Sequence, residues 1–250
     1  MIKDGMLIQQ LEKNDPDILG DVATGRQAYF IAKRVLDVLV ALTLLVFLSP
    51  LMLVTAVLIF VYSPGPIFFI QERVGAKVHF VGKTAYWKRV NIRCFKFRTM
   101  KVNADPAIHR AYVKALIEND EEKMAALQGA AVQPRKLIND PRIIRPGKWL
   151  RKWSIDELPQ LFNVLRGEMS MVGPRPAIPY EVEVYKPWHL QRLLAQPGIT
   201  GLQQITARCT KDFDEQVRLD VEYIEKQSFW FDLEIMLKTP FAILSAKGAY

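Results

Sequence analysis

The chain has 250 residues, half of them hydrophobic, and 34 Lys or Arg outweigh 26 Asp or Glu to give a net charge of +8. This length suits one domain or one domain with an appendage, and the charge favours an anionic partner: nucleic acid, anionic lipid or a phosphorylated substrate. Cys94, Cys209 and three scattered histidines lack the spacing of metal ligands, which argues against a zinc site and fits reduced thiols in the cytosol.

Residues 1–32 are polar and irregular, with Asp15-Pro16 and Gly20 as breakers. We expect a loose N-terminal extension here, ending in an interfacial turn that starts at Tyr29-Phe30-Ile31. The apolar segment Val35–Tyr62 follows and is the candidate membrane segment.

A single charge, Asp37, interrupts this apolar segment. As a straight helix the segment would run about 42 Å, well beyond the roughly 30 Å hydrocarbon core of a bilayer. Ser49 and Pro50 lie in its middle, and a proline removes a backbone donor and clashes with the carbonyl four residues earlier. We therefore expect a kink or break there, with Ser49 bonding a carbonyl that Pro50 frees.

Two membrane arrangements fit this segment: a tilted, kinked transmembrane helix, and a re-entrant helical hairpin that enters and leaves by one face. Basic residues prefer the cytoplasmic side of a membrane, and they flank the segment at both ends: Lys33, Arg34, Arg73, Lys77, Lys83, Lys88 and Arg89. A crossing would place one cluster outside, so we favour a hairpin over residues 33–63, broken at Ser49-Pro50. Arg34 and Asp37 are spaced to pair at the helix mouth.

Two short strands, Ile67–Ile70 and Arg93–Phe97, are predicted after a turn at Pro64-Gly65-Pro66. The second strand alternates aromatic and basic residues, so one of its faces is basic. On that face Lys96 and Arg98 fit two roles, a solvated strand surface or contact with phosphate. The glycines between the strands are expected at turns: Gly75 and Gly82.

The remaining elements are predicted to be helical. Residues 103–135 form a surface insertion that starts at Asp105-Pro106 and carries no chemistry. Phe213–Glu225 is a charged amphipathic helix. Ser228–Leu244 is apolar but interrupted by charges, which favours a helix lying on the membrane surface over one that crosses it. Trp188, among basic residues, fits an interfacial anchor and a core position equally well.

The stretch Ser154–Pro176 has the layout of a small active site. Asp156 and Glu157 are adjacent, and adjacent side chains diverge by about 100° on a regular helix. Two separate roles, a nucleophile and a magnesium ligand, therefore suit them better than a shared proton. A capping box of Ser154 and Glu157 is the alternative, but Pro159 would then lie too far inside the helix. We expect a fixed turn followed by a helix with Pro159 at its first position.

Arg175 lies between Pro174 and Pro176, which stiffen the loop that offers its guanidinium to phosphate. The alternative is a structural arginine that pairs with a carboxylate. Lys96, Arg151 and Arg208 are further basic candidates for the site, but spacing alone does not establish that they converge.

These motifs together resemble the monotopic phosphoglycosyl transferases, the bacterial sugar transferases that start exopolysaccharide, O-antigen and glycoconjugate assembly. The resemblance covers about residues 33–250. Its motifs, in order, are Lys33-Arg34-x-x-Asp37, Ser49-Pro50, Lys96-Phe97-Arg98-Thr99-Met100, Ser154-x-Asp156-Glu157-Leu158-Pro159-Gln160, Val172-Gly173-Pro174-Arg175-Pro176 and Pro197-Gly198-Ile199-Thr200-Gly201. Each motif is weak alone, and the ordered set is highly specific.

The resemblance implies transfer of a sugar 1-phosphate from a UDP-sugar to polyprenyl (undecaprenyl) phosphate, with release of UMP. It implies that Asp156 is the nucleophile, forming an aspartyl-phosphosugar intermediate, and that Glu157 binds Mg²⁺. Further active-site positions that it implies are Lys96, Arg151, Pro174, Arg175, Pro176, Arg208 and Asp232. It places the enzyme in the bacterial inner membrane with its catalytic domain on the cytoplasmic face.

The expected fold is therefore α+β and mostly helical. It joins a re-entrant membrane helix to a cytosolic catalytic domain, residues 64–250, with a short antiparallel β element and interfacial amphipathic helices. The resemblance has departures: Ala207 replaces a glycine common in the family, which makes the placement of Arg208 less certain, and the 103–135 insertion is absent from minimal members. The sugar and the oligomeric state, a homodimer included, stay open.

Two other functions compete with transfer. A membrane-bound UDP-sugar phosphohydrolase would use the same acid pair with water as acceptor, and a non-catalytic basic scaffold would bind anionic lipid or nucleic acid. A transferase should release UMP only with added polyprenyl phosphate, whereas a phosphohydrolase should release it equally without. A scaffold should bind in a salt-sensitive way that Asp156→Asn leaves unchanged.

Overall fold

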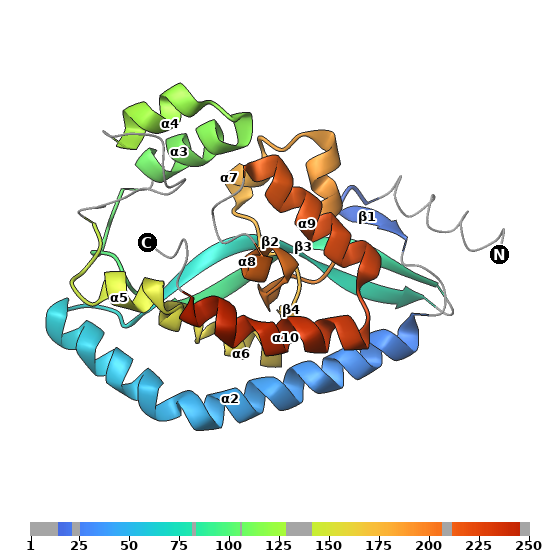
Figure 1. The fold of residues 1–250 in the computed structure, drawn as a ribbon, viewed down its shortest axis with the longest axis horizontal. Helices are drawn as coiled ribbons and strands as arrows, with labels where there is room; N and C mark the ends of the chain where they lie inside the picture. Colours follow the sequence, from blue (N-terminus) through green and yellow to red (C-terminus); the bar gives the residue numbers. More distant parts are fainter. Residues whose placement is uncertain are drawn as a thin grey trace.

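The computed structural model describes residues 15–21, 26–81, 84–105, 107–128, 142–206 and 212–245. Within them a small antiparallel sheet lies against a mostly helical body, and one long helix runs beneath both (Figure 1). The elements are β1 (Ile18–Asp21), α2 (Gln27–Tyr62), β2 (Phe68–Val81), β3 (Thr84–Phe97), α3 (Ala107–Glu118), α4 (Glu121–Gln128), α5 (Gly147–Lys152), η1 (Ile155–Glu157), α6 (Gln160–Leu165), β4 (Ser170–Val172), α7 (Pro179–Val182), η2 (Pro187–Leu193), β5 (Gly198–Thr200), α8 (Leu202–Thr206), α9 (Phe213–Lys226) and α10 (Phe229–Leu244).

The apolar segment forms one helix, α2, rather than two. Its ribbon bends near the middle (Figure 1), but the helix continues through Pro50. The Ser49 hydroxyl donates to the Val46 carbonyl at 2.9 Å, the carbonyl that Pro50 deprives of its partner. The predicted Ser49 bond is thus confirmed, and the predicted break is a bend, because this bond compensates for the missing N–H.

Both halves of α2 pack against the same body. The first half contributes Ala41 to a core with Val164 and Ile235, and the second half contributes Ile59 to a separate core with Leu150. α2 also begins earlier than expected. The extension predicted over residues 1–32 contains the strand β1 and the first turns of α2, so it is not loose throughout; residues 1–14 lie outside the described part.

The two predicted short strands are parts of a long hairpin. β2 and β3 pair antiparallel from Phe68↔Phe97 to Val81↔Thr84, and β1 adds to the outer edge of β3. Gly75 lies inside β2 and not at a turn; a Cβ at this position would approach a side-chain carbon of Pro197 to 2.7 Å. This glycine therefore allows close packing on the sheet. Gly82 lies outside the described residues.

The helical predictions for the rest of the chain are largely confirmed. α3 and α4 form the insertion, which lies on the side of the molecule away from α2 (Figure 1), and its residues 129–135 are outside the described part. The backbone N–H of Ala107 donates to Asp105 at 2.8 Å, as expected for a helix start. α9 and α10 begin with side-chain caps from Asp212 and Ser228.

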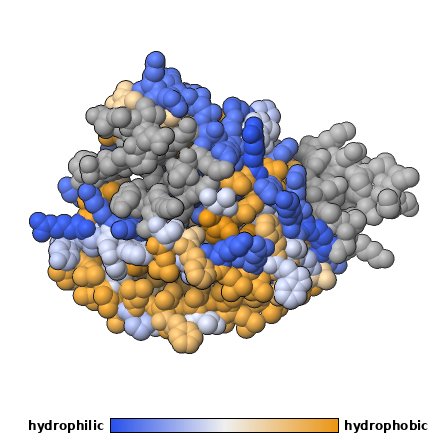
Figure 2. Space-filling model, viewed as in Figure 1, coloured by the Kyte–Doolittle hydropathy of each residue, from blue (hydrophilic) through white to orange (hydrophobic). Residues whose placement is uncertain are grey.

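The surface along α2 and the adjoining edge of α10 is apolar, whereas the opposite side is largely hydrophilic (Figure 2). Large apolar side chains are exposed on α2, such as Phe47 at 77%, and on α10, such as Trp230 at 76% and Phe241 at 73%. By length and composition α2 is the one described helix able to cross a membrane. An apolar face of this extent is unusual for a protein surrounded only by water.

Candidate active site

The adjacent carboxylates lie on a short, rigid turn. Ile155–Glu157 forms a single turn of 3-10 helix after Ser154, whose backbone is left-handed at φ 55°. The Ser154 side chain makes no capping hydrogen bond, and α6 begins directly after Pro159. The predicted order of turn and helix is confirmed, with Pro159 one position earlier than expected, at the N-cap; the capping-box alternative is wrong.

The residue before the pair ties this turn to α2. Ile155 is buried and packs in one core with Ile59 of α2 and with Phe97 of β3. Successive residues of a 3-10 helix are about 120° apart, so Asp156 and Glu157 point away from this core in two different directions. The two carboxylates therefore have separate surroundings.

Glu157 is held by two cations. Its Oε1 accepts from Lys96 Nζ and from Arg175 Nη2, both at 2.9 Å. Burial alone would raise the pKa of Glu157, but the charges of Arg175 and Lys96 hold this pKa well below its usual range. Glu157 is therefore a fixed anion. Arg175 pairs with a carboxylate, as its alternative role predicted, and Lys96 reaches the site. Both cations bind the same oxygen of Glu157.

Asp156 has no such partner. It is 9% exposed, and no side chain or backbone group in the described part of the chain bonds or ion-pairs with its carboxylate. Burial, and next the charge of Glu157, raise the pKa of Asp156 to about 6. One carboxylate is thus locked in an ion-pair network, and its neighbour keeps its oxygens available for reaction.

The loop that carries Arg175 is fastened on both sides. The Pro174 carbonyl accepts from the backbone N–H of Gly198 at 2.9 Å, and the Pro176 carbonyl accepts from Arg73 Nη1 at 2.8 Å. Ala177 then forms a two-bond bridge with Val74 of β2. The rigid loop predicted from the two prolines is confirmed.

Two residues that position the site were not predicted. Arg73 lines a small cavity together with Lys96 and Arg175. Asn163 is fully buried on α6; its side chain accepts from the backbone N–H of Phe95 at 3.0 Å and donates to the Arg93 carbonyl at 2.8 Å, which joins α6 to β3. The partners that tie them to the site, Pro176 for Arg73 and the backbone of β3 for Asn163, are distant in sequence, so no local spacing rule identifies them.

Other predicted site residues lie elsewhere or are not described. Arg151 donates to the Thr99 hydroxyl at 2.9 Å, and its charge acts on Asp156. Asp232 is 1% exposed, pairs with Lys33 at 2.9 Å and accepts from the hydroxyls of Tyr29 and Tyr223. These contacts favour a structural role for Asp232 rather than the predicted substrate contact. Arg208 and Ala207 lie outside the described residues.

The predicted pair between Arg34 and Asp37 does not form. Arg34 donates to the carbonyls of Val164 and Leu165 at the end of α6. Asp37 accepts from the Ser170 hydroxyl and from the backbone N–H of Met171. Both side chains join α2 to the elements packed on it. The end of α6 and the strand β4 lie close enough to offer these partners, so the two side chains bond there rather than to each other.

Arg98 closes the far end of α2. It is 4% exposed, and its guanidinium donates to the Ser63 hydroxyl and to the carbonyls of Ser63 and Pro64. Neither predicted role, a solvated strand face or phosphate contact, describes these bonds. Arg98 directly follows β3, and Lys96, near the end of β3, holds Glu157. The end of β3 therefore links the end of α2 to the carboxylate pair.

We expect Arg98→Gln to destabilise the fold by about 2 kcal/mol, because a buried charged donor to three acceptors is lost. Thermal unfolding in detergent should show the loss as a melting temperature lower by several degrees. Arg93→Gln, on an exposed arginine of the same strand, is the matched control and should leave the melting temperature unchanged. Equal melting temperatures for the two variants would contradict this role for Arg98.

Magnesium has few protein ligands available here. No group of three or more Asp, Glu, His or Cys side chains converges among the described residues. Mg²⁺ commonly takes one or two protein carboxylates and completes its shell with phosphate oxygens and water. In that mode the carboxylates that would hold the ion are those of Asp156 and Glu157.

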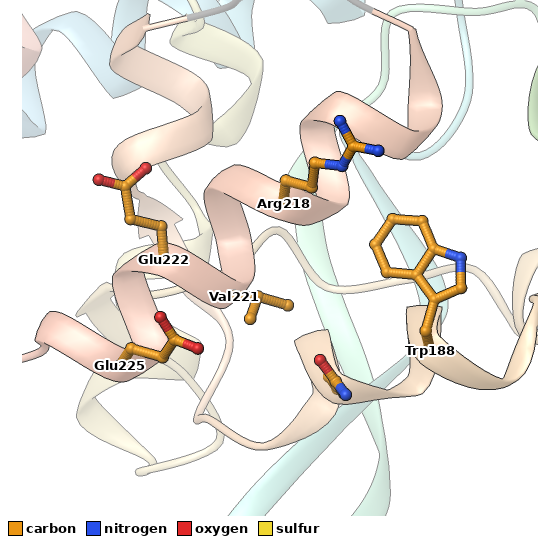
Figure 3. Close-up of a pocket in the computed structure, with 6 residues that line it drawn as sticks. Trp188, Arg218, Val221, Glu222 and Glu225 are labelled. Atoms are coloured by element: carbon orange, nitrogen blue, oxygen red, sulfur yellow. The ribbon is translucent and has the colours of Figure 1, made fainter.

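One surface hollow lies away from the carboxylate pair. It is a groove of about 300 Å³ between η2 and α9 (Figure 3), where Trp188 faces Arg218, Val221 and Glu222 across the opening. Trp188 is half-buried and packs against the core that α3 and α9 share, so the core alternative describes it better than the interfacial one. The groove is lined by side chains of mixed charge, two glutamates and one arginine, and among its described lining residues no cluster of cations faces a carboxylate.

The family model described as bacterial sugar transferase matches residues 28–246, nearly all of α2 through to the end of α10. The chain belongs to the bacterial sugar transferase family. It is 37% identical over 220 residues to the exopolysaccharide production protein ExoY of Sinorhizobium fredii, with 88% of each chain covered.

Longer relatives match over the same region. The chain is 37% identical to the undecaprenyl-phosphate galactose phosphotransferase of Salmonella typhimurium, and 35% identical to the UDP-glucose:undecaprenyl-phosphate glucose-1-phosphate transferase of Escherichia coli. Each alignment covers 87% of this chain and 41% of the relative. The chain thus spans less than half the length of these two proteins.

Proposed function

We propose that this protein transfers a sugar 1-phosphate from a UDP-sugar to polyprenyl phosphate, giving polyprenyl-diphosphate-sugar and UMP. The observation that carries the proposal is the division of roles between Asp156, which is buried and makes no ion pair with the described residues, and Glu157, which two cations hold. Lys96, Arg151 and Arg175 are the cations whose charges act on Asp156. Cations beside a carboxylate suit a phosphate ester that must be both bound and attacked. The named activities of the relatives support the same reaction class.

The reaction proceeds in two displacements. An Asp156 oxygen attacks the phosphorus that bears the sugar; the bond to the bridging oxygen breaks, and UMP leaves with that electron pair. A phosphate oxygen of the polyprenyl phosphate then attacks the same phosphorus and restores the Asp156 carboxylate. Both substrates are anions that repel each other, and a covalent intermediate lets each react with the enzyme alone.

The cations have distinct parts in this scheme. Lys96 and Arg175 neutralise the diphosphate oxygens and stabilise charge on the departing UMP. Glu157 keeps the two cations in place and, with Asp156, would hold Mg²⁺ through a carboxylate oxygen. When bound, Mg²⁺ supplies additional positive charge for the phosphate oxygens.

We propose further that α2 enters and leaves the membrane by one face and that α10 lies in the interface. Both halves of α2 pack on the same body, and Arg98 fastens the end of α2 to β3. Packing of both halves on one body favours a helix that leaves the bilayer by the face it entered over one that crosses. The exposed apolar side chains of α10, such as Trp230 and Phe241, fit the same interface.

Labelling tests this topology. Ala28→Cys and Pro66→Cys place thiols at exposed sites on either end of α2, in a Cys209→Ser background whose other cysteine, Cys94, is buried. With a membrane-impermeant maleimide we expect both sites to stay unlabelled in intact spheroplasts and to react after lysis. Labelling of one site alone in intact spheroplasts would show that α2 crosses the membrane.

The raised pKa of Asp156 predicts an acid limb in the first half-reaction. The attacking species is the ionised carboxylate, so formation of the covalent adduct should fall about tenfold per pH unit below pH 6 and level off above pH 7. Single-turnover measurements without polyprenyl phosphate isolate this step from titration of the acceptor phosphate. A rate that is constant from pH 5 to pH 7 would contradict the raised pKa.

UMP release from a panel of UDP-sugars, with polyprenyl phosphate and Mg²⁺, tests the proposed function directly. We expect one or a few sugars to be active and multiple turnover to require the polyprenyl phosphate. Equal multiple turnover without the acceptor would favour the phosphohydrolase. Binding of anionic lipid with no UMP from any UDP-sugar would favour the scaffold.

A further inference from the structure

Arg73 is buried without an acidic partner. Its side chain is 7% exposed, and burial lowers the pKa of its guanidinium. Nε and Nη2 donate to the amide oxygen of Gln71 at 3.1 Å and 2.6 Å, and Nη1 donates to the Pro176 carbonyl at 2.8 Å. No carboxylate of the described residues forms an ion pair with it. Burying a charge without a counter-charge is costly. The neutral oxygens of Gln71 and Pro176 do not offset this cost fully, so a further role for the charge of Arg73 is expected.

The cavity that Arg73 lines has an excess of positive charge. Arg73, Lys96 and Arg175 line it together, and no carboxylate is among its described lining residues. Glu157 pairs with Lys96 and Arg175, and the charge of Glu181 acts on Arg73 without forming an ion pair. The excess is compensated when an anion binds. For the proposed function that anion is the diphosphate of the UDP-sugar.

Arg73 also fixes the loop that presents Arg175. The carbonyls on either side of Arg175 are both bound, that of Pro174 by the backbone of Gly198 and that of Pro176 by Arg73. The Gly198 bond is a backbone bond that substitutions elsewhere leave in place. Glu157 binds the Arg175 guanidinium directly, and Arg73 is the side chain that fixes the loop backbone from which Arg175 extends.

We propose that Arg73 is a positioning residue that aims Arg175 at the diphosphate of the nucleotide sugar, an inference that rests on the proposed function. The planar fork of an arginine reaches Gln71 and Pro176 at once, and a lysine at this position retains the charge but satisfies only one of them. The geometry of the fork, and not charge alone, is what Arg73 supplies.

A double-mutant cycle on UDP binding tests this coupling without depending on turnover. Calorimetry on the full-length, detergent-solubilised protein should show that Arg73→Lys weakens UDP binding about tenfold in the wild-type background. In the Arg175→Ala background the same substitution should weaken it less than about twofold, because Arg73 acts through Arg175. Arg93→Lys, an exposed arginine of the paired strand, should have no effect in either background.

Equal losses in both backgrounds, or wild-type binding by Arg73→Lys, would overturn the proposal, as would a wild-type protein that does not bind UDP. Melting temperatures of all variants separate coupling from unfolding; if Arg73→Lys does not fold, Gln71→Ala, which frees one side of the fork, should give the same background-dependent loss. The two hypotheses fail separately. If Arg73→Lys weakens UDP binding only when Arg175 is present but no UMP is released from any UDP-sugar, the transferase is rejected. If UMP is released but the two substitutions lower UDP affinity additively, the role of Arg73 is rejected.

Discussion

Asp156→Asn should reduce UMP release to below about 10⁻⁴ of the wild-type rate and abolish the covalent adduct. The substitution preserves size and removes the charge that attacks phosphorus, so the cost is expected to resemble the loss of a nucleophile from other covalent enzymes. Multiple-turnover UMP release and intact-protein mass, each measured with an active UDP-sugar, report the two effects.

The control for this variant is Asp120→Asn, at an acidic residue of the insertion that pairs with Lys123 away from α2. It should retain full activity. Asp156 makes no hydrogen bond or ion pair with the described residues, and its buried charge costs stability above pH 6, so Asp156→Asn should not lower the melting temperature at pH 7 and should raise it slightly. Residual activity within about tenfold of wild type would exclude Asp156 as the nucleophile.

Glu157→Gln should lower the rate of adduct formation roughly 10²- to 10³-fold. The carboxylate is the shared acceptor of Lys96 and Arg175 at 2.9 Å, and an amide cannot balance two cations or bind Mg²⁺ as strongly. The two cations should then repel each other and lose the geometry in which they meet the diphosphate. Single-turnover kinetics with varied Mg²⁺ should show a higher metal requirement than that of the wild type.

Glu234→Gln is the matched control, because Glu234 also pairs with a lysine, Lys238, but at an exposed site on α10. Exposed pairs contribute little, so its kinetics should match the wild type. A Glu157→Gln variant with a wild-type rate and an unchanged dependence on Mg²⁺ would remove Glu157 from both proposed roles.

The parts of the site that the sequence predicts are those set by local rules. The turn at Asp156 and Glu157 follows from Pro159, which excludes a helix capped at Ser154. The bond from Ser49 to Val46 follows from the backbone donor that Pro50 lacks. In each case the deciding partner lies within a few positions along the chain.

The parts that it misses depend on contacts between distant segments. Arg73 meets Pro176 across 103 positions, and Lys33 meets Asp232 across 199. A spacing rule cannot report such contacts, so Arg73 was not predicted and Asp232 was assigned to substrate rather than to Lys33.

Gly75 was misread for a similar reason. A glycine between two apolar runs suggests a turn, but here its missing side chain makes room for Pro197, which follows it by more than a hundred positions. Both strands were therefore predicted too short.

The mass of the intact protein after incubation with a reactive UDP-sugar and Mg²⁺, without polyprenyl phosphate, is the most direct measurement of the proposed chemistry. We predict an increase equal to one sugar phosphate, located by fragmentation on the peptide that contains Asp156 and lost when polyprenyl phosphate is added. UMP formed at a full stoichiometric burst with no added mass, or with the mass on another residue, would contradict the account.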